Sequence, residues 1–185
     1  MASSRHGNYR FIKFAQKRFL EINQFLKREM FKIWIVNTHQ KVNPLALSFT
    51  LQKCQQLENL NIDLSRNMLG DEGLINFSTF LEHMTNLQSI YVDLSFNSIT
   101  EVGMRNLATN LSKCKSLRRV IINFQYNGLN EASIMALAQG MKQCRNINKI
   151  NLNFKNNRIR LDSYQKLSRE FEKYCKRLVC FKVSF

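Results

Sequence analysis

Apolar and polar residues alternate along several short stretches of the chain, and this alternation returns at a fixed interval. In one stretch Leu60, Ile62 and Leu64 are apolar at every second position, and Asn67 and Leu69 follow. Alternation of period two is typical of a strand that buries one face. The same pattern returns three times in succession, each time 30 residues further along, at positions 90–99, 120–129 and 150–159. The sequence therefore predicts a repeated strand.

After each asparagine the apolar spacing changes from two residues to four. Phe77 and Leu81 form one such pair, and equivalent pairs occur at 107 and 111, 137 and 141, and 167 and 171. Positions four apart share one face of a helix, so each unit is expected to be a strand followed by a helix. The asparagine at the turn can satisfy backbone groups that leave the sheet unpaired. Because one unit cannot bury its apolar face alone, the units are expected to stack.

The four units resemble the leucine-rich-repeat family, and in particular its ribonuclease-inhibitor-like subclass with long repeats. The resemblance rests on the run Leu60-x-Ile62-x-Leu64-x-x-Asn67-x-Leu69 and on its 30-residue interval. It implies an α/β solenoid, with a curved parallel sheet on one face and helices on the other. In this family the open, concave face of the sheet usually binds proteins. We assign the four clear repeats to residues 57–176.

The repeat pattern continues in weaker form at both ends, which extends the predicted leucine-rich-repeat domain to residues 27–185. Residues 27–56 are interpreted as a degenerate first repeat, in which a 30-residue step places Lys32 in a core strand position. Asn43 and Pro44 predict the start of its helix, because asparagine caps helices and proline suits their first turn. Residues 177–185 continue the alternation with a shift of one position and are expected to form a terminal strand.

Residues 1–26 form a basic N-terminal segment in which Phe11, Phe19, Ile22 and Leu26 recur at helical spacing. The end of a repeat array exposes its core, so the first interpretation is an amphipathic helix that caps the array. Three alternatives stay open: a helix on a membrane surface, a helix that docks into a partner, and a targeting segment. No acidic residue precedes Glu21, as in mitochondrial presequences, which is the basis of the last alternative.

Charge changes the picture, because the formal net charge is +15 and is unevenly distributed. Residues 1–60 carry 10 basic and 3 acidic side chains, residues 61–112 carry 2 and 6, and residues 113–185 carry 16 and 4. This balance predicts an anionic partner: nucleic acid, a membrane surface or an acidic protein. Many basic residues fall in successive helix-to-strand loops, which stacking would bring to one edge. The residues of this predicted basic edge are Lys113, Lys115, Arg118, Arg119, Lys142, Arg145, Lys149, Lys173, Lys176 and Arg177.

A second candidate surface lies between the core positions of the strands, on the open face of the predicted sheet. Neighbouring strands stand about 4.8 Å apart, so equivalent residues are expected to form ladders across them. These ladders are mostly small and polar, so the face either binds a partner or is solvated and hydrogen-bonded to itself. The residues of this candidate concave face are Asn61, Asp63, Tyr91, Asp93, Ile121, Asn123, Asn151 and Asn153.

The sequence offers little support for catalysis or metal binding. Cys54, Cys114 and Cys144 share one repeat position, where a small buried hydrophobic residue suits the end of each helix. Metal ligation would need closer spacing, and no glycine-rich phosphate loop is present. We therefore expect no enzymatic activity, no cofactor and no metal. No apolar run approaches the roughly 18 residues that a transmembrane helix needs.

These observations predict a non-catalytic interaction scaffold, or a subunit of a larger assembly, that docks basic surfaces on acidic protein partners. Two alternatives stay open: a component that binds the backbone of RNA or DNA, and a regulator of a partner enzyme such as a small GTPase. An odd number of cysteines, five in all, favours a reducing compartment. The predicted location is the cytoplasm, and the basic N-terminus makes the mitochondrion the alternative.

Overall fold

The computed structural model describes residues 32–35, 43–144, 146–174 and 180–184 of the chain. The predicted N-terminal cap, residues 1–26, lies outside the described residues. So do Arg145, Lys176 and Arg177 of the predicted basic edge. In the described part of the chain, no helix combines the length and the apolar character that crossing a membrane requires.

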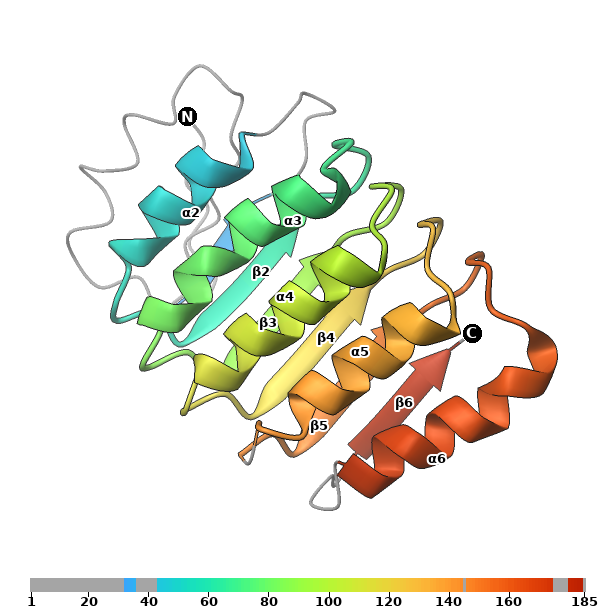
Figure 1. Cartoon of the computed structure of the whole chain (residues 1–185). Helices are drawn as coiled ribbons and strands as arrows, with labels where there is room; N and C mark the ends of the chain where they lie inside the picture. The colour runs from blue at the N-terminus through green and yellow to red at the C-terminus, as the bar shows by residue number, and fades with distance from the viewer. Residues whose placement is uncertain (1–31, 36–42, 145, 175–179, 185) are drawn as a thin grey trace.

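Within the described residues, six parallel strands form one sheet, and they lie side by side in chain order (Figure 1). Parallel neighbours need a connection of about a dozen residues or more, and the helical part of each unit supplies it. The strands are β1 Lys32–Ile35, β2 Asn59–Asp63, β3 Ser89–Asp93, β4 Arg119–Asn123, β5 Lys149–Asn153 and β6 Cys180–Ser184.

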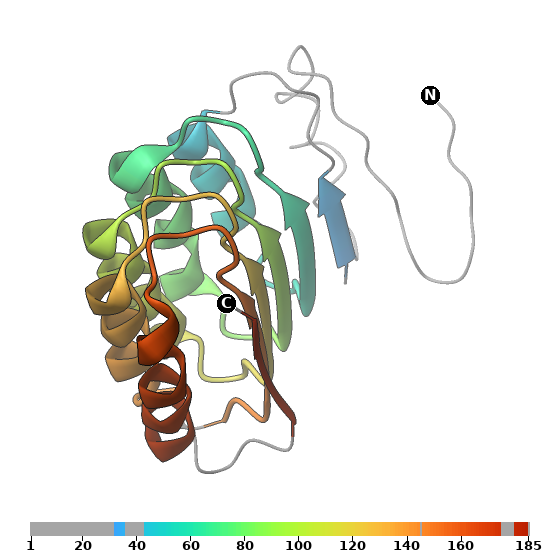
Figure 2. The same cartoon turned by 90° about the vertical axis from the view of Figure 1, so that its right-hand side faces the viewer.

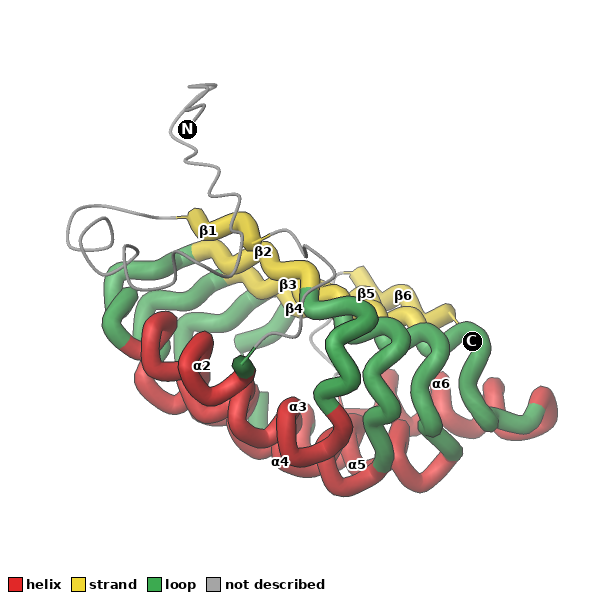
Figure 3. The backbone as a smooth tube through the Cα atoms, turned by 90° about the horizontal axis from the view of Figure 1, so that it is seen from above, coloured by secondary structure: helices red, strands yellow, loops and turns green. Residues whose placement is uncertain are grey.

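The described helices form a second layer on one face of this sheet (Figure 2). Seen from above, the strands and the helices run as two separate rows (Figure 3). The helices are α2 Pro44–Gln52, α3 Gly70–Ser78, α4 Glu101–Lys113, α5 Glu131–Met141 and α6 Tyr164–Tyr174, with short 3-10 helices η2 Thr79–His83 and η3 Leu161–Ser163. The predicted α/β class, with a parallel sheet on one side and helices on the other, is confirmed.

The strand register follows the 30-residue interval in the middle of the sheet and departs from it at both ends. Ile33 lies beside Leu60, a step of 27 residues, and Lys32 lies beside Asn59. The prediction of Lys32 in a core position is therefore wrong, because an odd change of offset exchanges the two faces of a strand. At the other end Phe181 lies beside Ile150, which confirms the terminal strand and its shift of one position.

A ladder of asparagines connects the turns that follow successive strands. The side-chain oxygen of Asn97 accepts hydrogen bonds from the backbone N–H groups of Asn67 and Leu69, at 3.0 and 3.2 Å. Its Nδ2 donates to three backbone carbonyls, at 2.8, 3.1 and 3.1 Å. Asn127 and Asn157 accept equivalent bonds one and two repeats later. The predicted role of the repeated asparagine, to satisfy backbone groups at the turn, is confirmed.

The space between the two layers is an apolar core to which both periodicities of the sequence contribute. Leu60 and Ile62 are buried on the strand side, and Phe77 and Leu81 are buried on the helix side. The equivalent strand positions of the next three repeats are also buried: Ile90, Val92, Val120, Ile122, Ile150 and Leu152. The helix α2 begins as predicted, because Pro44 is its first residue and the side chain of Asn43 caps it.

Glu131, in the first turn of α5, ties two repeats together. Its Oε1 accepts hydrogen bonds from the backbone N–H of Arg160 and from the hydroxyl of Ser163, both at 3.0 Å. The bond from the Arg160 backbone is the largest of the causes that lower the pKa of Glu131 from about 4.5 to about 2. The ionised carboxylate therefore belongs to the folded state.

This pKa gives stability a defined dependence on acid. Because the pKa of Glu131 is lower in the folded state, its contribution is present above about pH 4.5 and is lost as the pH falls towards 2. We expect Glu131→Gln to flatten the pH dependence of the free energy of unfolding within that window, measured by urea unfolding. Glu172→Gln, at an exposed position on α6, is the control and should keep the wild-type slope. An unchanged slope in Glu131→Gln would contradict the assignment.

Candidate functional site

The described part of the predicted basic edge is a row of helix-to-strand loops at the amino ends of the parallel strands (Figure 1). Arg119 opens β4 and lies directly beside Lys149, which opens β5. The carbonyl of Arg118 accepts hydrogen bonds from the N–H groups of Asn148 and Lys149, at 2.9 and 3.1 Å. These bonds hold two basic loops side by side, as the repeat pattern predicts.

Buried cysteines anchor these loops from the inside. The Sγ of Cys114 donates a hydrogen bond to the carbonyl of Leu81 in the preceding repeat, at 3.0 Å. Burial raises the pKa of the Cys114 thiol to about 12 and that of Cys54 to about 11. Cys144 is partly buried and packs against the core. The prediction that these three cysteines serve packing is confirmed, and the described residues contain no cluster of three or more potential metal ligands.

Counter-charge is scarce along this edge. Lys113 pairs with Glu82, with 2.8 Å between Nζ and Oε2, and the hydrogen bond from Lys113 lowers the pKa of Glu82. Arg118 and Arg119 are exposed and Lys149 is partly exposed. Within the described part of the chain, none of these last three forms an ion pair. Like charges held side by side repel one another, so this edge is suited to an anionic partner.

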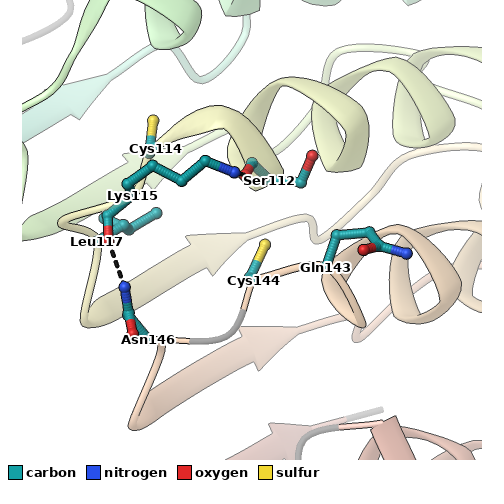
Figure 4. A pocket seen from close by; sticks show the side chains of 7 residues that line it. All are labelled: Ser112, Cys114, Lys115, Leu117, Gln143, Cys144 and Asn146. Carbon is teal, nitrogen blue, oxygen red and sulfur yellow. Dashed lines mark hydrogen bonds between the residues drawn. The ribbon is translucent and has the colours of Figure 1, made fainter.

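A pocket of about 440 Å³ opens between two consecutive basic loops (Figure 4). Asn146 Nδ2 donates a hydrogen bond to the carbonyl of Lys115 at 2.6 Å, which joins the two loops at the pocket. The pocket adds a recess beside the Lys115 ammonium group, where a carboxylate side chain of a partner would find both a charge and hydrogen-bond donors. The lining residues are Ser112, Cys114, Lys115, Leu117, Gln143, Cys144 and Asn146.

The predicted ladders on the open face of the sheet are present, in register from β2 to β5. Asn61, Tyr91, Ile121 and Asn151 form one ladder, and Asp63, Asp93, Asn123 and Asn153 form the other. In the second ladder, each side-chain oxygen accepts a hydrogen bond from the backbone N–H two residues further on, at 2.9 to 3.2 Å. These bonds form turns that end the strands. The second ladder thus has a structural role as well as an exposed position.

Sequence reasoning missed an aromatic stack on the edge opposite the basic loops. The rings of Phe96 and Tyr126 lie parallel, with their centroids 4.2 Å apart and an angle of 11° between them. The guanidinium of Arg66 lies 4.3 Å from the centroid of Phe96. These three residues are 30 positions apart in successive repeats, which was a detectable signal. The phenylalanine was interpreted as core because most phenylalanines of this chain fill core positions.

Comparison with known proteins supports the fold. No family model matches the chain, and no curated protein matches it. The solved structure of the leiomodin-1 actin-binding site 2 aligns with a TM-score of 0.61 and 14% identity, over 86% of this chain and 89% of that chain. The tropomodulin C-terminal domain of Caenorhabditis elegans aligns with a TM-score of 0.56 and 12% identity, over 86% of this chain and 94% of that chain.

At these identities the likeness shows the fold alone. It confirms a leucine-rich-repeat-like arrangement around a parallel sheet. The finer assignment to the ribonuclease-inhibitor-like subclass stays a prediction.

Proposed function

We propose that this chain is a non-catalytic protein-interaction module, which docks its basic edge on an acidic protein surface within a larger assembly. The observation that carries the proposal is the arrangement of Arg118, Arg119 and Lys149. They lie on adjacent loops in register, and they form no ion pair with other described residues. Repeated loops bring these charges together at successive strands, so the edge suits an extended anionic surface.

A protein partner is favoured over nucleic acid by the position of the aromatic side chains. Proteins that bind single strands combine a basic groove with aromatic rings on which bases stack. Here the exposed rings of Phe96 and Tyr126 follow the carboxyl ends of their strands, whereas Arg119 and Lys149 open the amino ends. One of the similar solved structures is named for an actin-binding site, so actin filaments are the first defined protein to test.

The proposal includes the predicted solenoid and its N-terminal cap. On α2, Leu45 and Phe49 lie four residues apart and remain 43% and 55% exposed. An apolar pair on the first helix of an array is the face that a capping segment covers. The proposal also includes the cytoplasm as the location and the absence of enzymatic activity and cofactor; the raised thiol pKa values of Cys54 and Cys114 support the latter, because a protonated thiol is a poor nucleophile.

The cap can be tested by a double-mutant cycle. Removal of residues 1–26 is expected to lower the free energy of unfolding by about 3 kcal/mol, because two large apolar side chains lose their cover. Leu45→Gln with Phe49→Gln should cost about as much in the full chain and far less in the shortened chain. The measurement is denaturant unfolding of all four proteins. Losses that simply add would show that residues 1–26 do not contact this face.

Affinity purification from the native source, with and without nuclease, tests the proposed function. We expect a defined set of proteins that stays bound after nuclease treatment, and we expect co-sedimentation with actin filaments if actin is among them. Loss of all partners on nuclease treatment would contradict the proposal and favour the nucleic-acid alternative. Recovery of the chain without partners in both conditions would contradict both. A rate assay with any small GTPase in the set tests the regulator alternative.

A further inference from the structure

An apolar patch is exposed on the edge opposite the basic loops. It consists of Met68, Phe96 and Tyr126, which follow β2, β3 and β4 and which we call the aromatic edge. Their exposed fractions are 76%, 38% and 48%. Exposed large apolar side chains are ordinary when scattered, but a contiguous stacked pair marks an interaction site more often than a solvated surface. Phe96 and Tyr126 form such a pair, with their ring centroids 4.2 Å apart.

The backbone under the aromatic edge makes bulky residues an expensive choice. The φ angles of Met68, Phe96 and Tyr126 are 50°, 58° and 54°, in the left-handed region where asparagine and glycine are favoured. In the next repeat the position equivalent to Tyr126 is Asn156, with a φ of 60°. The fold therefore accepts asparagine here, and the two rings are not required by the turn.

The electrostatic surroundings of the aromatic edge select a cation. Asp63 and Asp93 lie side by side in register on β2 and β3, and neither forms an ion pair within the described residues. Like charges directly opposite one another on adjacent strands are unfavourable. The pKa of Tyr91, between them on the open face, is raised first by burial and then by Asp93 and Asp63. Arg66 over the ring of Phe96 is an intramolecular example of a cation on this surface.

The wider edge has the same sign. The three segments 63–72, 93–102 and 123–132 contain six carboxylates and a single basic residue, Arg66. A five-residue strand separates this edge from the basic edge by about 16 Å. That is about twice the screening length of about 8 Å at physiological salt, so the two edges act as separate surfaces. Nucleic acid is therefore disfavoured at the aromatic edge despite its stacking rings.

We propose that the aromatic edge, together with Asp63 and Asp93, binds a basic segment of a partner protein. An arginine or lysine side chain of that segment lies against the two carboxylates, and its apolar neighbours pack on Phe96 and Tyr126. This surface is separate from the basic edge and takes a partner of opposite charge. The chain can thereby bridge an acidic and a basic protein surface within one assembly.

The test uses the full chain and a short fluorescent peptide of arginine, leucine and serine as the probe. We expect Phe96→Asn with Tyr126→Asn to weaken peptide binding about tenfold, because the stacking and apolar contacts are lost. The melting temperature should stay the same or rise, because asparagine suits the left-handed turn. Asp93→Asn should also weaken binding while it keeps the turn, since its amide oxygen can still accept from the Ser95 N–H. Arg119→Glu, on the other edge, is the matched control and should leave the affinity unchanged.

Three results would overturn this inference. One is equal binding of a peptide in which every arginine is replaced by glutamate, or of a single-stranded oligonucleotide. Another is peptide affinity that Phe96→Asn with Tyr126→Asn leaves unchanged. The third is self-association of the wild-type chain that disappears in this variant, which would assign the patch to a second copy. None of these results bears on the basic edge, so the proposed function is tested independently.

Discussion

Asn97→Ala is expected to lower the free energy of unfolding by about 3 kcal/mol or more, one of the largest effects of a single substitution in this chain. The side chain is fully buried and accepts from the N–H groups of Asn67 and Leu69. Each buried donor left without an acceptor costs about 1–3 kcal/mol, and two donors are affected. Three carbonyls also lose the Nδ2 donor. Equilibrium unfolding in denaturant measures the difference.

Asn148→Ala is the matched control for this prediction. Asn148 is exposed, and no side-chain hydrogen bond of Asn148 is found within the described residues. Its replacement should change the free energy of unfolding by less than about 0.5 kcal/mol. A loss in Asn97→Ala no greater than that of the control would show that the asparagine ladder does not stabilise the turns. The loops that carry both candidate surfaces would then need another explanation for their order.

Simultaneous reversal of Arg118, Arg119 and Lys149 to glutamate is expected to weaken binding to the native protein partner by about 100-fold. Each exposed charge contributes up to about 1 kcal/mol, and three together give about 3 kcal/mol, or two powers of ten in affinity. The variant should also lose most of the salt dependence of the association rate, because complementary charges steer the encounter. Surface plasmon resonance at several salt concentrations measures both quantities.

The control for this variant carries the same change in net charge elsewhere. Arg158→Glu, Lys166→Glu and Arg169→Glu alter exposed residues on the loop after β5 and on α6. This triple variant should bind within about twofold of the wild type, since separated surface charges are screened beyond about 8 Å. Equal weakening by both triple variants would mean that overall charge, and not the basic edge, controls binding. Unfolding curves of both variants should overlay that of the wild type.

The repeat length determined most of what the sequence could predict. Leu60, Ile62 and Asn67 recur at equal intervals, and stacking of equal units is the arrangement that buries the alternating residues and pairs the asparagines. The basic loops follow from the same reasoning, because equivalent positions of stacked units must be neighbours. Arg119 beside Lys149 is an example. Such predictions need only the period and the number of residues in each unit.

The features that the sequence could not supply depend on local geometry. The step of 27 residues into the first strand places Ile33, and not Lys32, in a core position, and no periodic extrapolation contains that change. The exposure of Phe96 and Tyr126 depends on a left-handed turn, which apolar spacing does not report. The pairing of Lys113 with Glu82 depends on side-chain reach between repeats. Hydrophobic pattern therefore predicts layers and register, but not which surface residues are already satisfied.

The most direct test of a basic-edge docking site is photo-crosslinking in extracts of the native source. A photoreactive residue replaces Arg119 on the basic edge in one protein and Gln139, exposed on α5, in the other. If the basic edge docks on an acidic protein, the reactive group at position 119 should capture a discrete protein that position 139 does not capture, and nuclease should not affect the product. Capture of nucleic acid at position 119, or equal capture at both positions, would contradict this function.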